Sequence, residues 1–104
     1  MPHFYINPRN KTFIDYIEFC ARVRDRAIVV DTLHEANACV ILGGQYLMAG
    51  YKPILEADMA AAREKGIPVY AVAPHGTGYI PWALRGANKH AMLDEVETLF
   101  QQNG

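Results

Sequence analysis

The sequence predicts a single α/β domain, in which a doubly wound, mostly parallel sheet of four to five strands carries helices on both faces. Short apolar runs alternate with segments of helical period along the whole chain, which indicates right-handed strand–helix–strand units. The run Ala38–Leu42 has no polar residue, as is typical of a central parallel strand covered on both sides. The 104 residues fit one domain and contain no linker or repeat.

The first part of the chain is predicted to hold two strands and two helices. Thr12, followed by Asp15, is typical of a helix N-cap with its capping box, and the apolar residues behind it recur at helical spacing. Thr32 with Glu35 repeats this pattern and predicts a helix of one or two turns. The predicted elements are strand His3–Ile6, loop Asn7–Asn10, helix Thr12–Arg24, strand Ala27–Val30 and a short helix ending near Asn37.

The second part begins with the buried strand Ala38–Leu42, and a glycine-rich loop is expected where Gly43-Gly44 ends it. Pro53 suits the first turn of a helix and Gly66 the position just past its end, so a helix is predicted between them. Asp94 is the expected N-cap of a terminal helix. The remaining predicted elements are strand Pro68–Ala73, loop Pro74–Tyr79, a helical turn at Ile80–Arg85 and strand Lys89–Met92.

The composition argues against several classes of partner and compartment. A formal net charge of −1 gives no basic surface for nucleic acid or an anionic membrane, and the longest apolar run is too short to cross a bilayer. The N-terminal residues lack the pattern of a signal peptide. Cys20 and Cys39 lie in apolar surroundings without CxxC spacing. We therefore expect a cytoplasmic protein whose two thiols are reduced and buried.

Several kinds of site are disfavoured as well. The chain contains no serine, which removes serine-hydrolase chemistry. It has neither a G-x-G-x-x-G motif nor a P-loop lysine motif, so a standard dinucleotide or triphosphate site is not expected. The four histidines show no metal-ligand spacing with the cysteines, and no metal is predicted.

A ligand of an open parallel sheet binds beyond the carboxyl ends of the strands, near the point where the strand order reverses. The predicted loops at this edge are Asn7–Asn10, Gly43–Tyr51 and Pro74–Tyr79. Each loop carries side-chain donors, or glycines that let backbone amides approach a ligand, and so suits a polar, anionic molecule. The candidate residues are Asn7, Arg9, Asn10, Gly43, Gly44 and His75, with Tyr46 and Tyr51 as possible stacking partners of a base. The alternative is that these are ordinary turn residues.

Glu56 lies about one turn into the helix that follows the two glycines. Stabilisation of its carboxylate by the positive end of the helix dipole is the structural interpretation. The functional interpretation is a carboxylate that acts on a sugar carbon, as a nucleophile or by stabilising positive charge. Asp58 lies two residues further on and is expected on a different face, where it would not share this task.

Three segments, in their order and spacing, resemble the TIR-like domains of bacteria and archaea, which include the TIR-like proteins of the Thoeris anti-phage system. The segments are Val40–Tyr46, Glu56–Ala60 and Lys65–Gly76. The family's pattern is a strand ending in a small-residue loop with Tyr, a helix entered through Trp with Glu four residues later, and Gly-Lys-Pro before a strand ending in Pro-x-Gly. The likeness covers about residues 38–92, and Lys52 stands where the family has Trp.

The resemblance implies a flavodoxin-like or TIR-like strand order and a nucleotide-type ligand. TIR-like enzymes cleave the nicotinamide–ribose bond of NAD and in some cases cyclise the ADP-ribose product, so NAD is implied as a substrate and no resident cofactor is expected. By position, the resemblance makes Glu56 the catalytic residue. It assigns the lining of the NAD site to Gly43, Gly44, Gln45 and Tyr46, to Asn7 and Arg9, and to Tyr51 in place of the family's Trp.

Many TIR-like sites are completed by assembly, so the resemblance also implies a homo-oligomer. The apolar segment Leu47–Gly50 is a candidate lid or dimer contact. Two alternatives to the NAD-cleaving enzyme remain open. The same order of elements resembles the nucleoside 2-deoxyribosyltransferases, which also attack an N-glycosidic carbon from a helix Glu. The third interpretation is a non-catalytic nucleotide-sensing or protein-interaction module.

Overall fold

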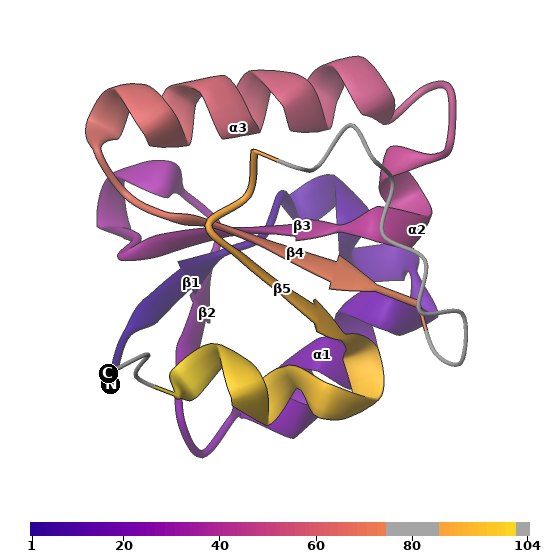
Figure 1. Cartoon of the computed structure of the whole chain (residues 1–104). Helices are drawn as coiled ribbons and strands as arrows, with labels where there is room; N and C mark the ends of the chain where they lie inside the picture. The colour runs from indigo at the N-terminus through magenta and orange to yellow at the C-terminus, as the bar shows by residue number, and fades with distance from the viewer. Residues whose placement is uncertain (75–85, 102–104) are drawn as a thin grey trace.

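The computed structural model describes residues 1–74 and 86–101, which form one five-stranded sheet with all neighbouring strands parallel. The strand order is β2-β1-β3-β4-β5, which is one of the common orders of a doubly wound sheet. The predicted fold class is therefore confirmed (Figure 1). The strands are β1 (His3–Tyr5), β2 (Ile28–Val30), β3 (Ala38–Leu42), β4 (Val69–Ala73) and β5 (Lys89–Met92).

The helices cover the sheet on both faces (Figure 1). The long helix α3 (Lys52–Lys65) crosses one face, and α1 (Ile14–Val23) lies on the other with the 3₁₀-helix η4 (Leu93–Phe100, yellow). Three shorter elements complete the described chain, namely the 3₁₀-helices η1 (Pro8–Thr12) and η2 (Leu33–Glu35) and the single turn α2 (Gly43–Tyr46).

The core consists of two apolar layers, one on each side of the sheet. All five residues of β3 are buried, and they alternate between the layers because successive side chains of a strand point to opposite faces. Val40 packs in the layer of α1 and η4, whereas Ile41 packs in the layer of α3. Burial on both faces explains why this strand has no polar residue.

The segment after β1 differs from its prediction as a loop that leads to a helix capped by Thr12. Pro8–Thr12 is a 3₁₀-helix, because Asn7 caps it by accepting a hydrogen bond from the backbone N–H of Arg9, and Pro8 suits its first turn. Thr12 lies inside this turn, so it cannot cap the next helix. Helix α1 begins at Ile14, and its N-cap residue Phe13 makes no side-chain cap hydrogen bond.

The glycines after β3 form part of a helix, which corrects the predicted loop. Gly43 and Gly44 belong to α2, and Gly66 is the only described glycine with a positive φ. Space for a side chain at Gly44 is limited. A Cβ there would lie 3.0 Å from the Oδ2 atom of Asp15 in α1 and 3.5 Å from the Cγ atom of Pro74.

The ends of the other helices test the remaining cap predictions. Gly66 ends α3 with φ 83°, as predicted, and its N–H donates to the carbonyls of Ala62 and Arg63. Asp94 is not the terminal cap, because η4 begins one residue earlier and has Met92 as its N-cap residue. Thr32 precedes η2 but donates its hydroxyl to the Glu35 side chain, 2.8 Å away, and makes no cap hydrogen bond to the backbone.

The structure also bears on the two cysteines and on the lengths of the helices. Both cysteines are free thiols, but only Cys39 is buried as predicted, and Cys20 is half-buried. Burial raises the pKa of the Cys39 thiol to about 12, which makes it unreactive at neutral pH. Within residues 1–74 and 86–101, none of the helices combines the length and the apolar character that crossing a membrane requires.

Candidate functional site

The point where the strand order reverses lies between β1 and β3. From β1 the chain runs through α1 to β2, whereas from β3 it runs through α3 to β4 on the other side. Because α1 and α3 cover opposite faces, a crevice is expected between them at the carboxyl ends of these strands. The segments at this edge are η1, which follows β1, and α2, which follows β3.

A polar cluster joins β1 to α3 at this edge. The side-chain amide nitrogen of Asn7 donates to Oδ2 of Asp58 at 2.9 Å, and the hydroxyl of Tyr5 donates to Oδ1 at 3.3 Å. Asp58 and Asn7 are half-buried, and Tyr5 is buried. The carboxylate of Asp58 is thus held by two neutral donors beside the end of β1.

The surroundings of this cluster change its acidity. Burial raises the pKa of the Asp58 carboxyl above its ordinary value of 3.8, although the hydrogen bonds from Asn7 and Tyr5 partly lower it. Burial also raises the pKa of the Tyr5 hydroxyl, and the negative charge of Asp58 raises it further. Tyr5 therefore keeps its proton and remains a donor, while Asp58 is a stronger base than an exposed carboxylate.

Glu56, the residue that the sequence predicts to be catalytic, lies on the exposed side of α3. It accepts a hydrogen bond from the Tyr46 hydroxyl, with 3.4 Å between the oxygens, so it does face α2. The ammonium of Lys52 lies 5.7 Å from the centre of the Tyr46 ring. The predicted catalytic role of Glu56 stays a prediction.

A second set of contacts ties η1 to the start of α3. The Tyr51 hydroxyl donates to the carbonyl of Arg9 at 3.4 Å, and the Tyr51 ring packs edge-on against Phe13 with 5.2 Å between centroids. The side chain of Arg9 is exposed. Tyr51 thus closes one side of the edge, and it is the neighbour of Lys52, the position where the resemblance expects Trp.

Two buried amide side chains lie in the segments at this edge. Asn10 in η1 is fully buried, and neither of its side-chain polar atoms has a hydrogen-bond partner in the described structure. Gln45 in α2 is also buried, and its Oε1 has no partner there. Unpartnered groups of this kind cost roughly 1–3 kcal/mol each, and proteins tend to keep such groups at functional positions.

Most of the predicted site residues come together at one edge, but His75 lies outside the described residues. So do most of the loop Pro74–Tyr79, the helical turn at Ile80–Arg85 and Trp82. Tyr46 bonds to Glu56 of α3, and the carbonyl of Tyr51 accepts a hydrogen bond from Leu55 in the first turn of α3. Gly43, Gly44 and Gln45 lie in α2 together with Tyr46. Asn7 does not pair with Glu56 but with Asp58.

Asp58 was predicted to lie on a different face from Glu56 and was given no role, and Tyr5 was not among the candidate residues. A signal for Asp58 does exist, because it lies three residues after Leu55 and four before Ala62, and both of these are buried. An acidic residue beside the buried stripe of a helix is unusual unless it has partners. The partner Tyr5 could not be found in this way, because its hydroxyl meets α3 only through the tertiary fold.

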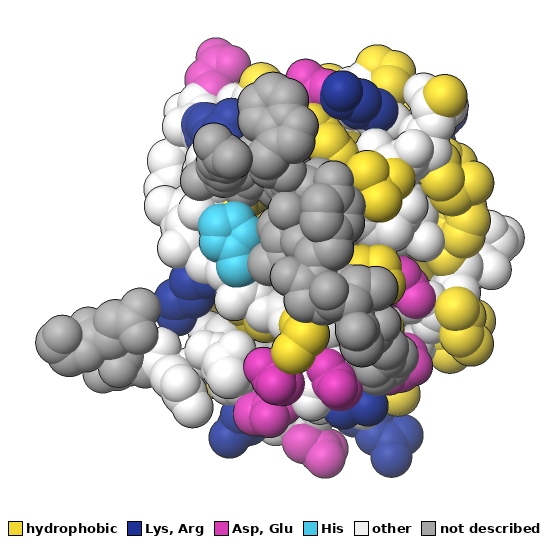
Figure 2. Space-filling model, turned by 45° about the vertical axis from the view of Figure 1, so that its right-hand side comes forward, with side chains coloured by type: hydrophobic (Ala, Val, Ile, Leu, Met, Phe, Trp, Pro, Cys, Tyr) yellow, Lys and Arg dark blue, Asp and Glu magenta, His cyan; other side chains and the backbone are white. Residues whose placement is uncertain are grey.

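The surface near this edge is mixed in character. Figure 2 shows hydrophobic side chains toward the right of the view and acidic side chains in its lower part. Leu47 and Met48, from the predicted lid or dimer contact, are 57% and 43% exposed. Their exposure agrees with an apolar surface segment after α2, and the lid and dimer roles stay predictions.

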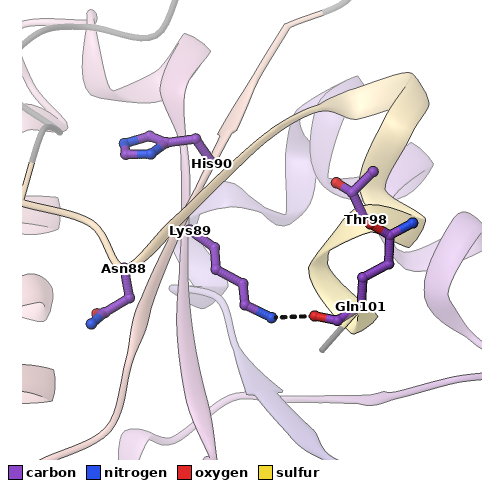
Figure 3. A pocket seen from close by; sticks show the side chains of 5 residues that line it. All are labelled: Asn88, Lys89, His90, Thr98 and Gln101. Carbon is purple, nitrogen blue, oxygen red and sulfur yellow. Dashed lines mark hydrogen bonds between the residues drawn. The ribbon is translucent and has the colours of Figure 1, made fainter. Parts of the chain in front are cut away.

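A separate hollow of about 380 Å³ lies at the start of β5, away from the carboxyl ends of β1 and β3. Figure 3 shows its lining residues, which are Asn88, Lys89, His90, Thr98 and Gln101. The ammonium of Lys89 donates to the carbonyls of Leu99 and Gln101, both at 3.0 Å. This cation is engaged at the end of η4, so we favour the edge between β1 and β3 as the ligand site.

Comparisons of the chain with protein-family models, with curated proteins and with solved structures find no match.

Proposed function

We propose that this protein binds a nucleotide-type ligand at the edge between β1 and β3 and cleaves the nicotinamide–ribose bond of NAD. The observation that carries the proposal is the half-buried Asp58 carboxylate, held by Tyr5 and Asn7 beside the point where the strand order reverses. A carboxylate there suits a sugar carbon that becomes positively charged as its base leaves. The resemblance to TIR-like domains supports NAD as the substrate.

The proposal is also supported by the segments that surround this carboxylate. Tyr46 of α2 donates a hydrogen bond to Glu56 of α3, and the Tyr51 hydroxyl donates to the carbonyl of Arg9 in η1. The buried amides of Asn10 and Gln45 give this edge polar groups that packing alone does not require. We propose the same edge for a homo-oligomer contact through the exposed Leu47 and Met48.

Incubation of the purified protein with NAD, with nicotinamide release as the readout, tests the enzyme proposal. We expect release by the wild type and none by the double variant Glu56→Gln/Asp58→Asn, which removes both carboxylates in question. Circular dichroism of the double variant controls for loss of fold. The absence of release by the wild type at high protein concentration would contradict NAD cleavage.

Two further assays separate the alternatives. Transfer of deoxyribose between two nucleobases, without NAD cleavage, favours the deoxyribosyltransferase alternative. If neither reaction occurs, melting of the wild type with NAD, ADP-ribose and AMP tests the binding module, because a ligand that binds only the folded state raises the melting temperature. No shift with any of these compounds would contradict a nucleotide site altogether.

A further inference from the structure

The two carboxylates in the first half of α3, Glu56 and Asp58, leave the helix on opposite sides of its buried stripe. Leu55, Met59 and Ala62 form that stripe and face the sheet. With about 100° of rotation per residue, Glu56 and Asp58 lie on either flank of it. Glu56 meets the Tyr46 hydroxyl of α2, whereas Asp58 meets Tyr5 and Asn7 at the end of β1.

We propose that Asp58, and not Glu56, is the carboxylate that contacts the sugar of the ligand, and that Tyr5 and Asn7 are its positioning residues. This inference rests on the proposed function, since it assigns a role within the same site. It departs from the position that the resemblance gives to the catalytic residue, and its basis is the hydrogen-bond geometry of the described residues.

The contacts of Asp58 leave part of its carboxylate available to a ligand. An ionised carboxylate accepts about four hydrogen bonds. Asp58 accepts one at each oxygen, from Tyr5 and Asn7, and among the described residues it forms no ion pair. Its side chain is half-buried, so part of the carboxylate is accessible to a ligand while the two hydrogen bonds fix its orientation.

The Glu56 carboxylate is more exposed than that of Asp58 and accepts one hydrogen bond where Asp58 accepts two. Glu56 is exposed and accepts one long hydrogen bond of 3.4 Å, so bulk water screens its charge. Burial raises the pKa of Asp58, and a carboxylate that is partly removed from water interacts more strongly with a positive charge. The desolvated group is therefore the better stabiliser of a sugar cation.

The reaction that Asp58 would assist is balanced without a further reagent. The bond between the anomeric carbon and the nitrogen of nicotinamide breaks, and its electron pair stays on that nitrogen. The anomeric carbon becomes positively charged, and the Asp58 carboxylate stabilises it. Water then adds its oxygen to the carbon and releases one proton to the solvent. Tyr5 and Asn7 keep their protons throughout and hold the two carboxylate oxygens in place.

A matched pair of variants tests this assignment. Asp58→Asn and Glu56→Gln each exchange a carboxylate for an amide of the same shape, two residues apart on one helix. For nicotinamide release from NAD, we expect Asp58→Asn to lower kcat/KM by about 100-fold or more, since such preorganised electrostatic groups contribute at that level. We expect Glu56→Gln to lower kcat/KM much less than Asp58→Asn does, because water screens the exposed Glu56 carboxylate and weakens its interaction with a sugar cation. The melting temperatures of both variants control for loss of fold.

Tyr5→Phe tests the positioning role, because it keeps the ring and removes one donor to Asp58. Loss of that donor raises the pKa of Asp58, so we expect the acidic limb of the kcat/KM profile to move to higher pH. A purely structural role would lower activity equally at every pH. An unchanged profile therefore overturns the positioning role of Tyr5.

The outcomes separate this inference from the proposed function. If Asp58→Asn still releases nicotinamide and Glu56→Gln does not, the assignment of Asp58 as the sugar-contacting carboxylate is wrong, but NAD cleavage is supported. Loss in Asp58→Asn alone, in a folded variant, supports both. A wild type that neither releases nicotinamide nor melts at a higher temperature with NAD overturns the proposed function, and the assignment fails with it.

Discussion

The side-chain amide of Asn7 and the carboxylate of Asp58 are joined by a 2.9 Å hydrogen bond, although 51 positions separate them in the sequence. This bond ties the residue that follows the first strand to the middle of helix α3. It places a half-buried carboxylate at the one edge where a doubly wound sheet is expected to bind its ligand. Burial raises the pKa of the Asp58 carboxyl, and the bond from Asn7 partly offsets this rise.

The first prediction concerns pH. The pKa of Asp58 is raised in the folded protein above its ordinary value of 3.8, so the folded state binds the proton more tightly than the unfolded state. The resulting stabilisation is fully present below pH 3.8 and is lost as the pH rises through the raised pKa. Relative to Asp58→Asn, the wild type should therefore be more stable in acid than at pH 7.

Urea unfolding of both proteins at several pH values, from about 7 to about 3, measures this difference. Comparison of the pair cancels the titration of the other carboxylates, which both proteins share. As the pH falls below the raised pKa of Asp58, the unfolding free energy of the wild type should rise relative to that of Asp58→Asn. A salt-bridged aspartate, whose pKa is lowered, would give the opposite trend. A difference in unfolding free energy that does not vary with pH would contradict the raised pKa.

The second prediction concerns the end of helix α3. Gly66 has a φ of 83°, a conformation that side chains with a Cβ disfavour. Gly66→Ala should therefore destabilise the protein by about 1 kcal/mol, measured by urea or thermal unfolding. The matched control is Gly50→Ala, because Gly50 has a negative φ and a Cβ there would meet nothing within 4 Å. The control should be neutral or slightly stabilising, and equal effects of the two substitutions would argue against the left-handed cap.

The third prediction concerns the link between α3 and η2. The ammonium of Lys65 donates to the carbonyls of Leu33 and His34, at 3.2 and 2.6 Å. Lys65→Met keeps the apolar stem and removes these bonds, so we expect a loss of about 1 kcal/mol of stability, a modest figure because the bonds are exposed. Lys65→Arg keeps the charge at the helix end and should retain part of that stability. If methionine proves as stable as lysine, the bonds contribute nothing measurable in solution.

Much of the fold could be predicted because its determinants are local. The apolar run of β3 and the glycine after α3 each specify one element from a few neighbouring residues, and both predictions are confirmed. The prediction of a cap at Thr12 is wrong because two local signals compete. Asn7 and Pro8 start a 3₁₀-turn earlier, and that turn includes Thr12. Sequence patterns alone cannot decide between a turn capped by Asn7 and a helix capped by Thr12, because the choice depends on the free energies of the two structures.

The candidate site was predicted less completely, because its key contacts are tertiary. Asn7 was identified from its position after β1, but its partner could be known only once α3 was placed across the sheet. The choice of Glu56 over Asp58 followed from position along the helix and from the resemblance. Only the structure shows that the Glu56 carboxylate is exposed, whereas the Asp58 carboxylate is half-buried against β1.

The pairing of β1 has a consequence for local opening of the sheet. Strand β1 pairs with β3 through Phe4–Ala38 and Tyr5–Cys39 alone, whereas β3 pairs with β4 along most of its length. Tyr5 thus lies in the shorter pairing and Asn7 just beyond it, whereas Asp58 belongs to α3, which connects β3 to β4. Separation of β1 from β3 would move Tyr5 and Asn7 away from the Asp58 carboxylate without unfolding α3. A ligand that touches both sides would slow the exchange of the β1 amide hydrogens with solvent, because it raises the free energy of that opening.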